Sequence, residues 1–480
     1  MKSRKRISAG KCVQSVAHRV YESGMEFVSL ARGVEIGANS YLLRGGGHSV
    51  VLDAGMHPKR EGLDATPDFS LLPNGGPDAV LVTHAHQDHV GALPVLTREH
   101  RVSRVFMTEG TTRVADAMLH NSVNVMTRQK EELGIDAYPL FTHRGVEISR
   151  ESWQPCRFHH AYDFKGERVP AGSEDSFEFY PAGHILGAAG ALIRMDGRTV
   201  FYTGDVNFEN QSLIRGADFP ESGVDILIME TTRGDSPTPA GFTRAREEER
   251  LCEEIQEAFA SGGSVLIPVF ALGKTQELLA MLWRMQLRGD LGRVPIYIGG
   301  LSTKLTTIYD AFAKDPQRLQ PDLQLLTEVA PYVISGNEAS SLAPRKKCIF
   351  ALSSGMMSEN TISNIFAKKI LPDPNHSLFF IGYCDPESPA GKIRAAASGD
   401  SVRLDPRGPD IPLHCRIREF TFSAHASRES LFNYASALRP KKILLVHGDR
   451  AAIDWFHLRL HRELPETEVI IPEPGRRIAL

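Results

Sequence analysis

The chain has 480 residues, of which 42% are hydrophobic and 24% are charged. This composition predicts a soluble globular protein of two or three domains. The formal net charge of −3 excludes a bulk attraction to nucleic acid, so a polyanionic substrate would have to be held by a local groove or by metal ions. No apolar run approaches the roughly 18 residues of a membrane helix, and the six cysteines stand singly. We therefore expect no membrane partner, and reduced thiols in a cytoplasmic location.

Residues 1–24 form a basic N-terminal extension that contains no acidic residue before Glu22. The segment lacks the apolar stretch of a secretory signal peptide. We expect an added helix or tail there, with a short organelle-targeting segment as the alternative.

From Met25 the sequence alternates between apolar and polar residues in the manner of β-strands. One such strand, residues 48–52, is followed directly by Asp53 and then by Ala-Gly. A carboxylate at a strand end either caps the turn or orients metal ligands and water from behind. Asp53 is therefore a candidate catalytic residue.

The most informative stretch is the H-x-H-x-D-H motif of residues 84–89, which follows the short apolar run 79–82. On an extended segment His84 and His86 point to the same side, so both can bind one metal ion. Asp88 and His89 follow where the chain turns into a helix, and they face a second position. Because Zn²⁺ accepts imidazole nitrogen and carboxylate oxygen as ligands, the motif predicts a dinuclear metal site rather than a surface loop rich in histidine.

Two later strands also end in residues that can bind metal. His184 follows the strand 176–180 and is surrounded by small residues, which allow the backbone to approach a crowded site. Asp205 follows the strand 199–203 after a single glycine, and its carboxylate is able to bridge two cations. Four strand ends thus carry residues of this kind: Asp53, residues 84–89, His184 and Asp205. Chance is a very improbable explanation for all four.

The second half of the chain alternates strands and helices, which predicts another α/β layer. Glu230 ends a buried strand, and His425 and His447 lie near the end of the chain. The segment around Lys274 superficially suggests a P-loop. That motif requires glycine five residues before Gly273, where this chain has Pro268, so we exclude a P-loop NTPase.

Taken together, these motifs resemble those of the β-CASP branch of the metallo-β-lactamase superfamily, which includes the cleavage and polyadenylation endonuclease and the ribonuclease J group. The resemblance rests on residues 84–89 and on the stretches METTRGD, IPVFALGKTQELL, SSGMM, FSAH and LLVHG. It implies an α/β fold, a metallo-β-lactamase αββα sandwich with an inserted β-CASP α/β domain. The expected divisions are the extension (1–24), the first part of the metallo-β-lactamase domain (25–221), the β-CASP domain (222–430) and the return of the metallo-β-lactamase domain (431–480).

The resemblance also implies the ligands of two Zn²⁺ ions, for which Mn²⁺ is an expected substitute. One ion would be held by His84, His86 and His184, and the other by Asp88, His89 and His447, with Asp205 bridging both. Glu230 and His425 match the first two additional motifs of the branch, and His447 matches the third. DNA-repair members typically have valine at that third position, so His447 favours RNA.

We therefore predict a zinc-dependent ribonuclease that hydrolyses phosphodiester bonds of single-stranded RNA, internally or from the 5′ end. Two metal ions about 3.5–4 Å apart activate water and neutralise phosphoryl charge, with Asp53 and Asp88 as catalytic residues. The leaving oxygen needs a proton, which a histidine held by a carboxylate is suited to give. We assign this role to His425 with Glu230.

The sequence says less about how the substrate is held. Lys274, Lys392 and Arg394 are candidates for contacts with backbone phosphates, and the turn Ser353-Ser354-Gly355 for backbone N–H contacts; solvated charges and an ordinary turn explain them equally well. Residues 299–302 and 385–389 depart from the pattern of the family. The alternatives are a DNA nuclease, a small-molecule ester or thioester hydrolase and a non-catalytic nucleic-acid-binding subunit. The resemblance also allows a homodimer.

Overall fold

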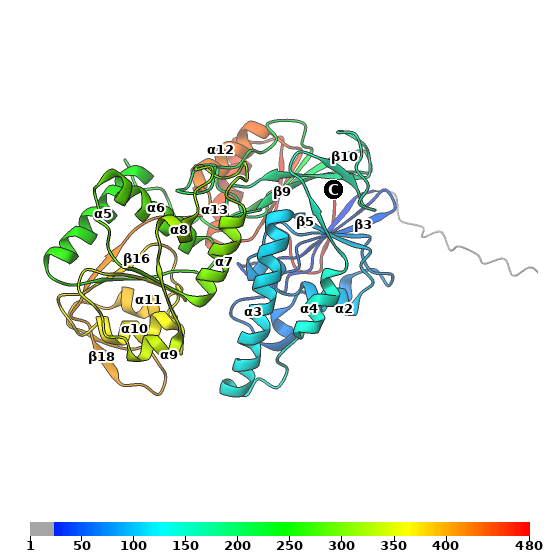
Figure 1. The fold of residues 1–480 in the computed structure, drawn as a ribbon. Coiled ribbons are helices and arrows are strands. Elements are labelled where there is room, and N and C mark those ends of the chain that lie inside the picture. The colour runs from blue at the N-terminus through cyan, green and yellow to red at the C-terminus, as the bar shows by residue number, and fades with distance from the viewer. Residues whose placement is uncertain (1–23) are drawn as a thin grey trace, which may run out of the picture.

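The structure is a computed structural model that describes residues 24–480, so residues 1–23 of the predicted N-terminal extension lie outside the described residues. Figure 1 shows two lobes. One is formed by the blue-to-teal part of the chain together with the red C-terminal segment, and the other by the green-to-orange middle of the chain. Among the described residues, no helix combines the length and the apolar character needed to cross a membrane.

The first lobe contains two seven-stranded sheets. The first sheet has the order β22-β1-β2-β3-β4-β5-β6. Its strands are β22 (Arg477–Ala479), β1 (Glu26–Ser29), β2 (Tyr41–Gly45), β3 (His48–Leu52), β4 (Ala79–Leu81), β5 (Arg104–Thr108) and β6 (Trp153–Cys156). From β3 to β6 the strands are parallel.

The second sheet has the order β21-β20-β11-β10-β9-β8-β7. Its strands are β21 (Glu468–Ile470), β20 (Lys442–Val446), β11 (Ile226–Glu230), β10 (Arg198–Tyr202), β9 (Ala189–Met195), β8 (Ser176–Pro181) and β7 (Ala161–Asp163). The chain therefore returns to this sheet, and then to the first one, after it has built the other lobe.

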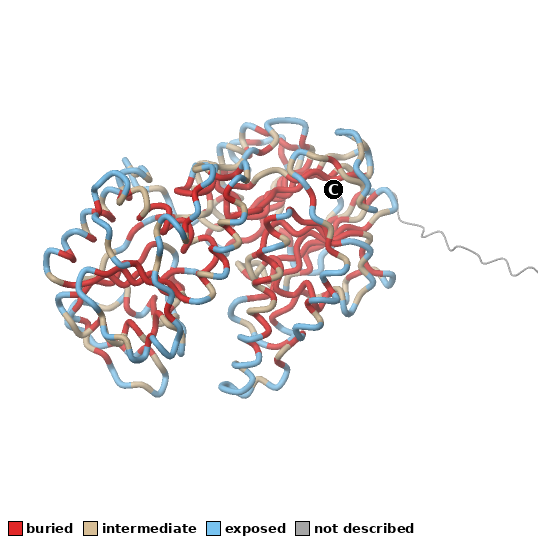
Figure 2. The backbone as a smooth tube through the Cα atoms, in the orientation of Figure 1, coloured by how far each residue is buried: buried red, intermediate tan, exposed pale blue. Residues whose placement is uncertain are grey.

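The two sheets pack face to face, and helices cover their outer faces. In β3, Val50 and Leu52 belong to the apolar core between the sheets, whereas Val51 packs on the opposite face towards the helices. Successive side chains of a strand point to opposite faces, so a strand buried on both sides needs a continuous apolar sequence. Figure 2 shows this burial as red bands through the sheets.

The second lobe is built on a six-stranded parallel sheet with the order β14-β13-β15-β12-β16-β19. Its strands are β14 (Tyr332–Ile334), β13 (Ile296–Gly299), β15 (Ile349–Leu352), β12 (Val265–Pro268), β16 (Ser377–Phe380) and β19 (Arg416–Glu419). A small hairpin, β17 (Ser401–Arg403) and β18 (Asp410–Pro412), precedes β19. Helices flank both sides of this sheet (Figure 1).

Thirteen α-helices lie within residues 24–480. They are α1 (Gln87–Val90), α2 (Leu93–Glu99), α3 (Glu109–Leu133), α4 (His143–Arg150), α5 (Arg244–Ala260), α6 (Lys274–Arg288), α7 (Gly300–Ala311), α8 (Leu325–Glu328), α9 (Gly336–Ser341), α10 (Ile362–Ile370), α11 (Pro389–Ala395), α12 (Arg428–Leu438) and α13 (Arg450–Glu463). Five of the eight helices with eight or more residues begin after a threonine or serine whose side chain accepts an N–H of the first turn, as Thr108 does for α3.

One predicted boundary differs from the structure. The prediction assigns β11 to the inserted domain that starts at residue 222, but β11 pairs in parallel with β10 and β20 of the first lobe. A fully buried apolar strand looks the same in any parallel sheet, so its sequence does not reveal its partners. The inserted lobe begins after Glu230.

The two lobes share one apolar core, which runs from the helices of the first lobe to α5–α8 of the second. Polar contacts reinforce it at the loop that carries His184. The backbone N–H of Leu186 donates to the Tyr309 hydroxyl (3.1 Å), and that of Gly187 donates to Gln317 Oε1 (3.0 Å). The inserted lobe therefore helps to hold a loop of the predicted metal site in place.

Candidate metal centre

The strands that carry the predicted ligands all end at one edge of the sandwich. β3 and β4 are parallel and lead to Asp53 and to residues 84–89. β10, β11 and β20 are parallel and lead to Asp205, Glu230 and His447. β8 runs in the same direction, because β9 is antiparallel to both β8 and β10, and it leads to His184. The topology thus brings these side chains together.

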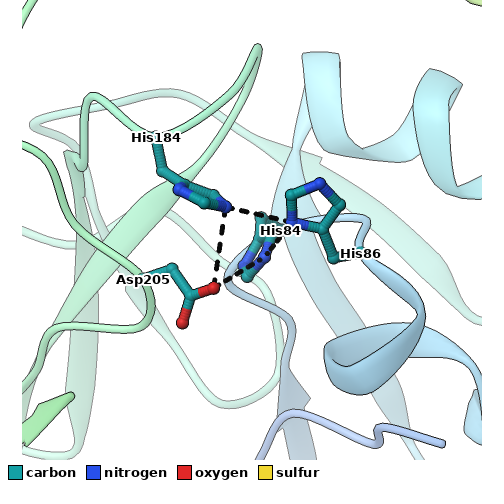
Figure 3. A group of neighbouring side chains, drawn as sticks. All are labelled: His84, His86, His184 and Asp205. Atoms are coloured by element: carbon teal, nitrogen blue, oxygen red, sulfur yellow. Dashed lines mark hydrogen bonds and ion pairs between the residues drawn. The ribbon is translucent and has the colours of Figure 1, made fainter. Parts of the chain in front are cut away.

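A first group of donor atoms is formed by three histidines and a carboxylate (Figure 3). His86 Nδ1 lies 3.1 Å from His84 Nε2 and 3.0 Å from His184 Nε2. Asp205 Oδ2 lies 3.5 Å from His84 Nε2 and 3.6 Å from His184 Nε2. Donor atoms held about 2.0–2.2 Å from one tetrahedral ion would lie about 3.3–3.6 Å apart. The geometry of this group therefore fits a single metal ion.

A second group lies on the other side of Asp205. It consists of Asp88, His89 and His447. Asp205 Oδ1 is 3.2 Å from His89 Nε2 and 3.2 Å from His447 Nε2, and both nitrogens are 3.8 Å from Asp88 Oδ2. One oxygen of Asp205 faces each group, which is the arrangement of a bridging carboxylate.

The chemistry of these donors also fits metal ions. Asp205 Oδ1 is buried and has no hydrogen-bond partner among the described residues, and such a group is costly unless something else satisfies it. Burial lowers the pKa of His84 and His184, and that of His86 to about 4, so these imidazoles are neutral, as coordination requires. Burial opposes ionisation of Asp205, but the neighbouring His447 and His89 outweigh it and hold the pKa of Asp205 well below its usual range.

Asp53 supports the centre from behind. It is fully buried, and its Oδ2 accepts a hydrogen bond from His89 Nδ1 (2.8 Å) and another from the Tyr202 hydroxyl (2.8 Å). Its Oδ1 accepts the Thr83 N–H (2.7 Å). With all its lone pairs used inside the protein, Asp53 fixes the ring of His89 so that Nε2 faces Asp205. It is a positioning residue rather than one that contacts the attacking water.

Replacing Asp53 with asparagine is expected to weaken metal binding about 10- to 100-fold, the usual cost of losing the partner of a metal-binding histidine. The amide NH₂ would face donors, because every neighbour of this carboxylate donates to it. Metal affinity is measured by competition with a chromophoric chelator. Tyr202→Phe removes only one of these hydrogen bonds and should have a smaller effect; equal effects would contradict the role assigned to Asp53.

The turn that carries His184 depends on Gly183. Its φ is +71°, and a Cβ there would lie 2.3 Å from the carbonyl oxygen of Asn207 and 2.6 Å from the N–H nitrogen of Ala217. Gly197 has a similar φ of +68° but open space around it. The two glycines thus separate the cost of the backbone conformation from the cost of a steric clash.

Gly197→Ala is expected to lower the free energy of unfolding by about 1–2 kcal/mol, the strain of a left-handed conformation at a residue with a side chain. Gly183→Ala should lower the free energy of unfolding by clearly more, because two backbone segments must also move. It should also weaken metal binding, because it displaces His184. Urea denaturation of both variants measures the difference. Equal losses would mean that the turn relaxes without moving its neighbours.

His425 lies beside the first group. Its Nδ1 is 3.1 Å from Glu230 Oε2, and its Nε2 is 3.9 Å from Asp205 Oδ2. Burial opposes the charged form, but Glu230 and Asp205 outweigh it and raise the pKa of His425. Glu230 is itself held, because its Oε1 accepts the Val206 N–H (2.6 Å). These carboxylates therefore favour the imidazolium form of His425 at the edge of the metal centre.

Three family profiles match the chain, each over a different part of it. The metallo-beta-lactamase superfamily profile matches residues 33–123, the Beta-Casp domain profile residues 275–393, and the Zn-dependent metallo-hydrolase RNA specificity domain profile residues 410–472. The chain belongs to the β-CASP branch of the metallo-β-lactamase superfamily. The predicted sandwich with an inserted β-CASP domain is thereby confirmed, and so is a site for a divalent metal ion.

Similar proteins come from animals, archaea and fungi. The chain is 29% identical over 449 residues to cleavage and polyadenylation specificity factor 73 of Drosophila melanogaster, covering 92% of this chain and 62% of that protein. It is 28% identical over 433 residues to an RNase J-like protein of Methanocaldococcus jannaschii (88% and 94%), and 29% identical over 439 residues to endoribonuclease ysh1 of Schizosaccharomyces pombe (89% and 54%). It thus spans little more than half of the two eukaryotic relatives and nearly all of the archaeal one.

A solved structure shares the fold. A crystal structure of a protein of unknown function from Enterococcus faecalis aligns with a TM-score of 0.51 at 12% identity, covering 95% of this chain and 100% of the other. At this identity the likeness concerns the fold alone.

The predicted substrate contacts lie in the β-CASP lobe, and they differ in their exposure and in their contacts with other residues. Arg394 forms an ion pair with Glu419, so a phosphate would compete with that carboxylate for its guanidinium. Lys392 is exposed on α11. The Nζ of Lys274 donates to the carbonyl oxygen of Phe422, and burial lowers the pKa of Lys274 to about 7.

The turn of residues 353–355 makes most of its hydrogen bonds within its own segment of the chain. The carbonyl oxygens of Ser353 and Ser354 accept hydrogen bonds from the backbone N–H and the hydroxyl of Ser363, and Ser354 Oγ accepts the Ser358 N–H (3.3 Å). Gly355 lines a cavity together with Lys274. Of the predicted substrate contacts, these two are the ones that share a cavity.

One residue of the site is not predicted from the sequence. The buried Asn39 accepts a hydrogen bond from His447 Nδ1 at its Oδ1 (3.1 Å), and its Nδ2 donates to the carbonyl oxygen of Asp88 (3.1 Å), so it links two members of the second group.

Proposed function

We propose that this protein is a ribonuclease that hydrolyses single-stranded RNA with two Zn²⁺ ions. The observation that carries the proposal is the Asp205 carboxylate, which turns one oxygen to each of two histidine groups beside the His425–Glu230 pair. A clamp for two metal ions next to a proton donor suits phosphodiester hydrolysis. An acyl hydrolase would leave the His425–Glu230 pair and the whole inserted lobe without a task.

In this proposal the bound metal ions supply Lewis-acid stabilisation of phosphoryl charge and an attacking water of lowered pKa. The protein residues do the rest. Asp53 and Asn39 hold the rings of His89 and His447 in place. Glu230 keeps His425 charged and oriented, and His425 Nε2 delivers its proton to the leaving oxygen.

RNA is favoured over DNA by the relatives. The Drosophila and fission-yeast proteins carry names of RNA-processing factors, and the archaeal protein is named RNase J-like. The RNA specificity profile covers residues 410–472, which include His425 and His447. Because the chain spans little more than half of the eukaryotic relatives, RNA cleavage remains a proposal for this chain.

The test is a cleavage assay with end-labelled single-stranded RNA and DNA of one sequence, using zinc-loaded parent protein and an Asp205→Ala variant. We expect the parent to cut RNA and the variant to cut neither. The product ladder distinguishes internal cleavage from cleavage at the 5′ end. Preferential cutting of DNA would replace the proposed substrate by DNA. Hydrolysis of small esters without cleavage of either nucleic acid would overturn the proposal.

Metal identity, location and assembly have their own tests. Elemental analysis of the purified protein decides between zinc and manganese, and between one and two ions per chain. The five cysteines within the described residues are free and buried, which supports a reducing compartment such as the cytoplasm. Light scattering tests the homodimer.

A further inference from the structure

We propose that a cavity at the carboxyl ends of β12 and β16 binds one nucleobase of the substrate, by stacking against Phe270 and Tyr383. This inference rests on the proposed ribonuclease function and deepens it. It assigns a place for a base near the scissile bond, and it explains why the substrate must be single-stranded.

The cavity lies where the strand connections of the β-CASP sheet diverge. β12 and β16 are adjacent and parallel, and the chain leaves β12 towards β13 on one side and β16 towards β19 on the other. Open parallel sheets bind ligands at the carboxyl ends of two such strands. Residues from both ends line the cavity, 268–270 at the end of β12 and 380–384 at the end of β16. The topology therefore predicts a ligand site here, independently of the metal centre.

The cavity carries exposed aromatic rings. Phe270 is 38% exposed and Tyr383 is 64% exposed. Within residues 24–480 the one other aromatic side chain counted among the exposed large hydrophobic residues is Tyr332, on the edge strand β14. Two of three exposed aromatic rings thus line a single cavity, where a flat apolar surface would remove them from water.

The cavity is shallow and open to the surface. Its empty volume of about 250 Å³ includes open solvent, so a base would stack against the exposed rings and would not be enclosed. Lys274 lines the same cavity, where its Nζ donates to the carbonyl oxygen of Phe422.

The backbone segments that carry the two rings are held in place. The carbonyl oxygen of Phe270 accepts hydrogen bonds from the N–H (3.1 Å) and the hydroxyl (2.9 Å) of Thr275. Its ring packs on Gly355, where a Cβ would lie 3.1 Å from the ring carbons. An ion pair between Lys59 and Asp385 ties the loop that carries Tyr383 to the metallo-β-lactamase lobe. Segments held in this way lose less backbone entropy when a ligand binds.

The cavity also adjoins the metal centre. Lys274 Nζ donates to the carbonyl oxygen of Phe422, in the loop that carries His425. That loop contacts the metal centre, because His184 Nδ1 donates to the carbonyl oxygen of Ala424 (2.9 Å). The residue before Lys274 abuts the His184 turn, and a Cβ on Gly273 would lie 2.7 Å from Ile185 Cγ2. A strand held with its scissile phosphate at the metal centre thus has a base within reach of the two rings.

Stacking on aromatic rings tolerates any base and is worth about 5- to 150-fold in affinity per base. The experiment replaces each nucleotide in turn near the scissile bond by an abasic residue and measures kcat/KM. In the parent, the abasic substitution at one position should lower kcat/KM by at least about fivefold. In the double variant Phe270→Leu/Tyr383→Leu, which keeps apolar bulk and so protects the fold, the same abasic substitution should cost nothing further.

Tyr332→Leu is the matched control, because it removes an exposed tyrosine from the same sheet; it should keep the full abasic effect.

A second readout does not depend on cleavage. Metal-free protein is titrated into RNA carrying 2-aminopurine at that position, and the parent and Tyr332→Leu should quench the fluorescence while the double variant does not. An abasic effect that survives in the double variant, or quenching that persists in it, would overturn the subsite. Cleavage by the parent with no sensitive position would overturn the subsite and leave the ribonuclease in place. If the parent cleaves no RNA, the ribonuclease fails, and titrations of RNAs that carry 2-aminopurine at each position in turn still decide the subsite.

Discussion

An Asp205→Ala variant is expected to lose RNA cleavage to background and to bind fewer metal ions than the parent. Asp205 faces both ligand groups, with Oδ2 at 3.5–3.6 Å from His84 and His184 and Oδ1 at 3.2 Å from His89 and His447. Its removal takes a ligand from both ions at once. The rate of RNA cleavage should therefore fall further than it does when a proton donor is removed, which slows a reaction about 10²–10⁴-fold.

The measurement combines single-turnover cleavage of labelled RNA with elemental analysis of the same preparation. The matched control is Asp218→Ala, which removes an aspartate paired with His159 at 3.3 Å but with 75% of its side chain exposed. This variant should keep both its metal and its activity. Full metal content in Asp205→Ala would show that the carboxylate does not bridge, and the dinuclear assignment would fall.

The candidate ligands are accessible to sequence reasoning because each follows a strand. An apolar run that ends in His, Asp or Glu can be read locally, and parallel strands bring their carboxyl ends to one edge of a sheet whatever their order. The six residues 84–89 place four donors with no tertiary information at all. His425 and His447 are harder, because they lie more than 200 residues from His184, and only the family resemblance joins them to the others.

Other features depend on pairings that no local pattern records. β11 has the composition of any buried strand, so only its hydrogen bonds to β10 and β20 reveal its sheet. Arg394 is one of many exposed-looking arginines until its ion pair with Glu419, 25 residues away, is seen.

The aromatic cavity could not be predicted for a related reason. Phe270 and Tyr383 are more than a hundred residues apart, and each follows an apolar run that predicts a core position. They share a cavity because β12 and β16 are neighbours. The strand order of the β-CASP sheet is therefore the missing information, and it is also what makes this point of the sheet a natural ligand site.

The second large effect concerns the proton delivered to the leaving oxygen. His425→Ala is expected to slow RNA cleavage about 10²–10⁴-fold with metal content unchanged, because His425, whose Nε2 is 3.9 Å from Asp205 Oδ2, is not among the ligands of the two proposed metal sites. A matched control is His159→Ala, which removes another histidine paired with a carboxylate, on the exposed surface. It should cleave at the parent rate.

The partner residue requires a careful choice of substitution. Glu230 accepts the Val206 N–H (2.6 Å), next to Asp205, as well as holding His425. Glu230→Ala would leave that buried N–H unpaired and disturb the metal centre, at a cost of about 1–3 kcal/mol. Glu230→Gln keeps an acceptor for it and removes only the charge that favours the imidazolium. In a His425→Ala background, Glu230→Gln should slow RNA cleavage little further, because both residues act through the same proton transfer.

A change of leaving group separates proton donation from a merely structural role. Sulfur in place of the leaving oxygen departs readily without a proton, so a substrate with this single substitution should be cleaved by His425→Ala at a rate close to that of the parent. Asp205→Ala should not be rescued, because its defect lies in the metal ions and not in the leaving group. If His425→Ala stays equally slow on the sulfur substrate, His425 acts by holding the loop of residues 422–427 against Val206 and His184, and the proton donor must be sought elsewhere.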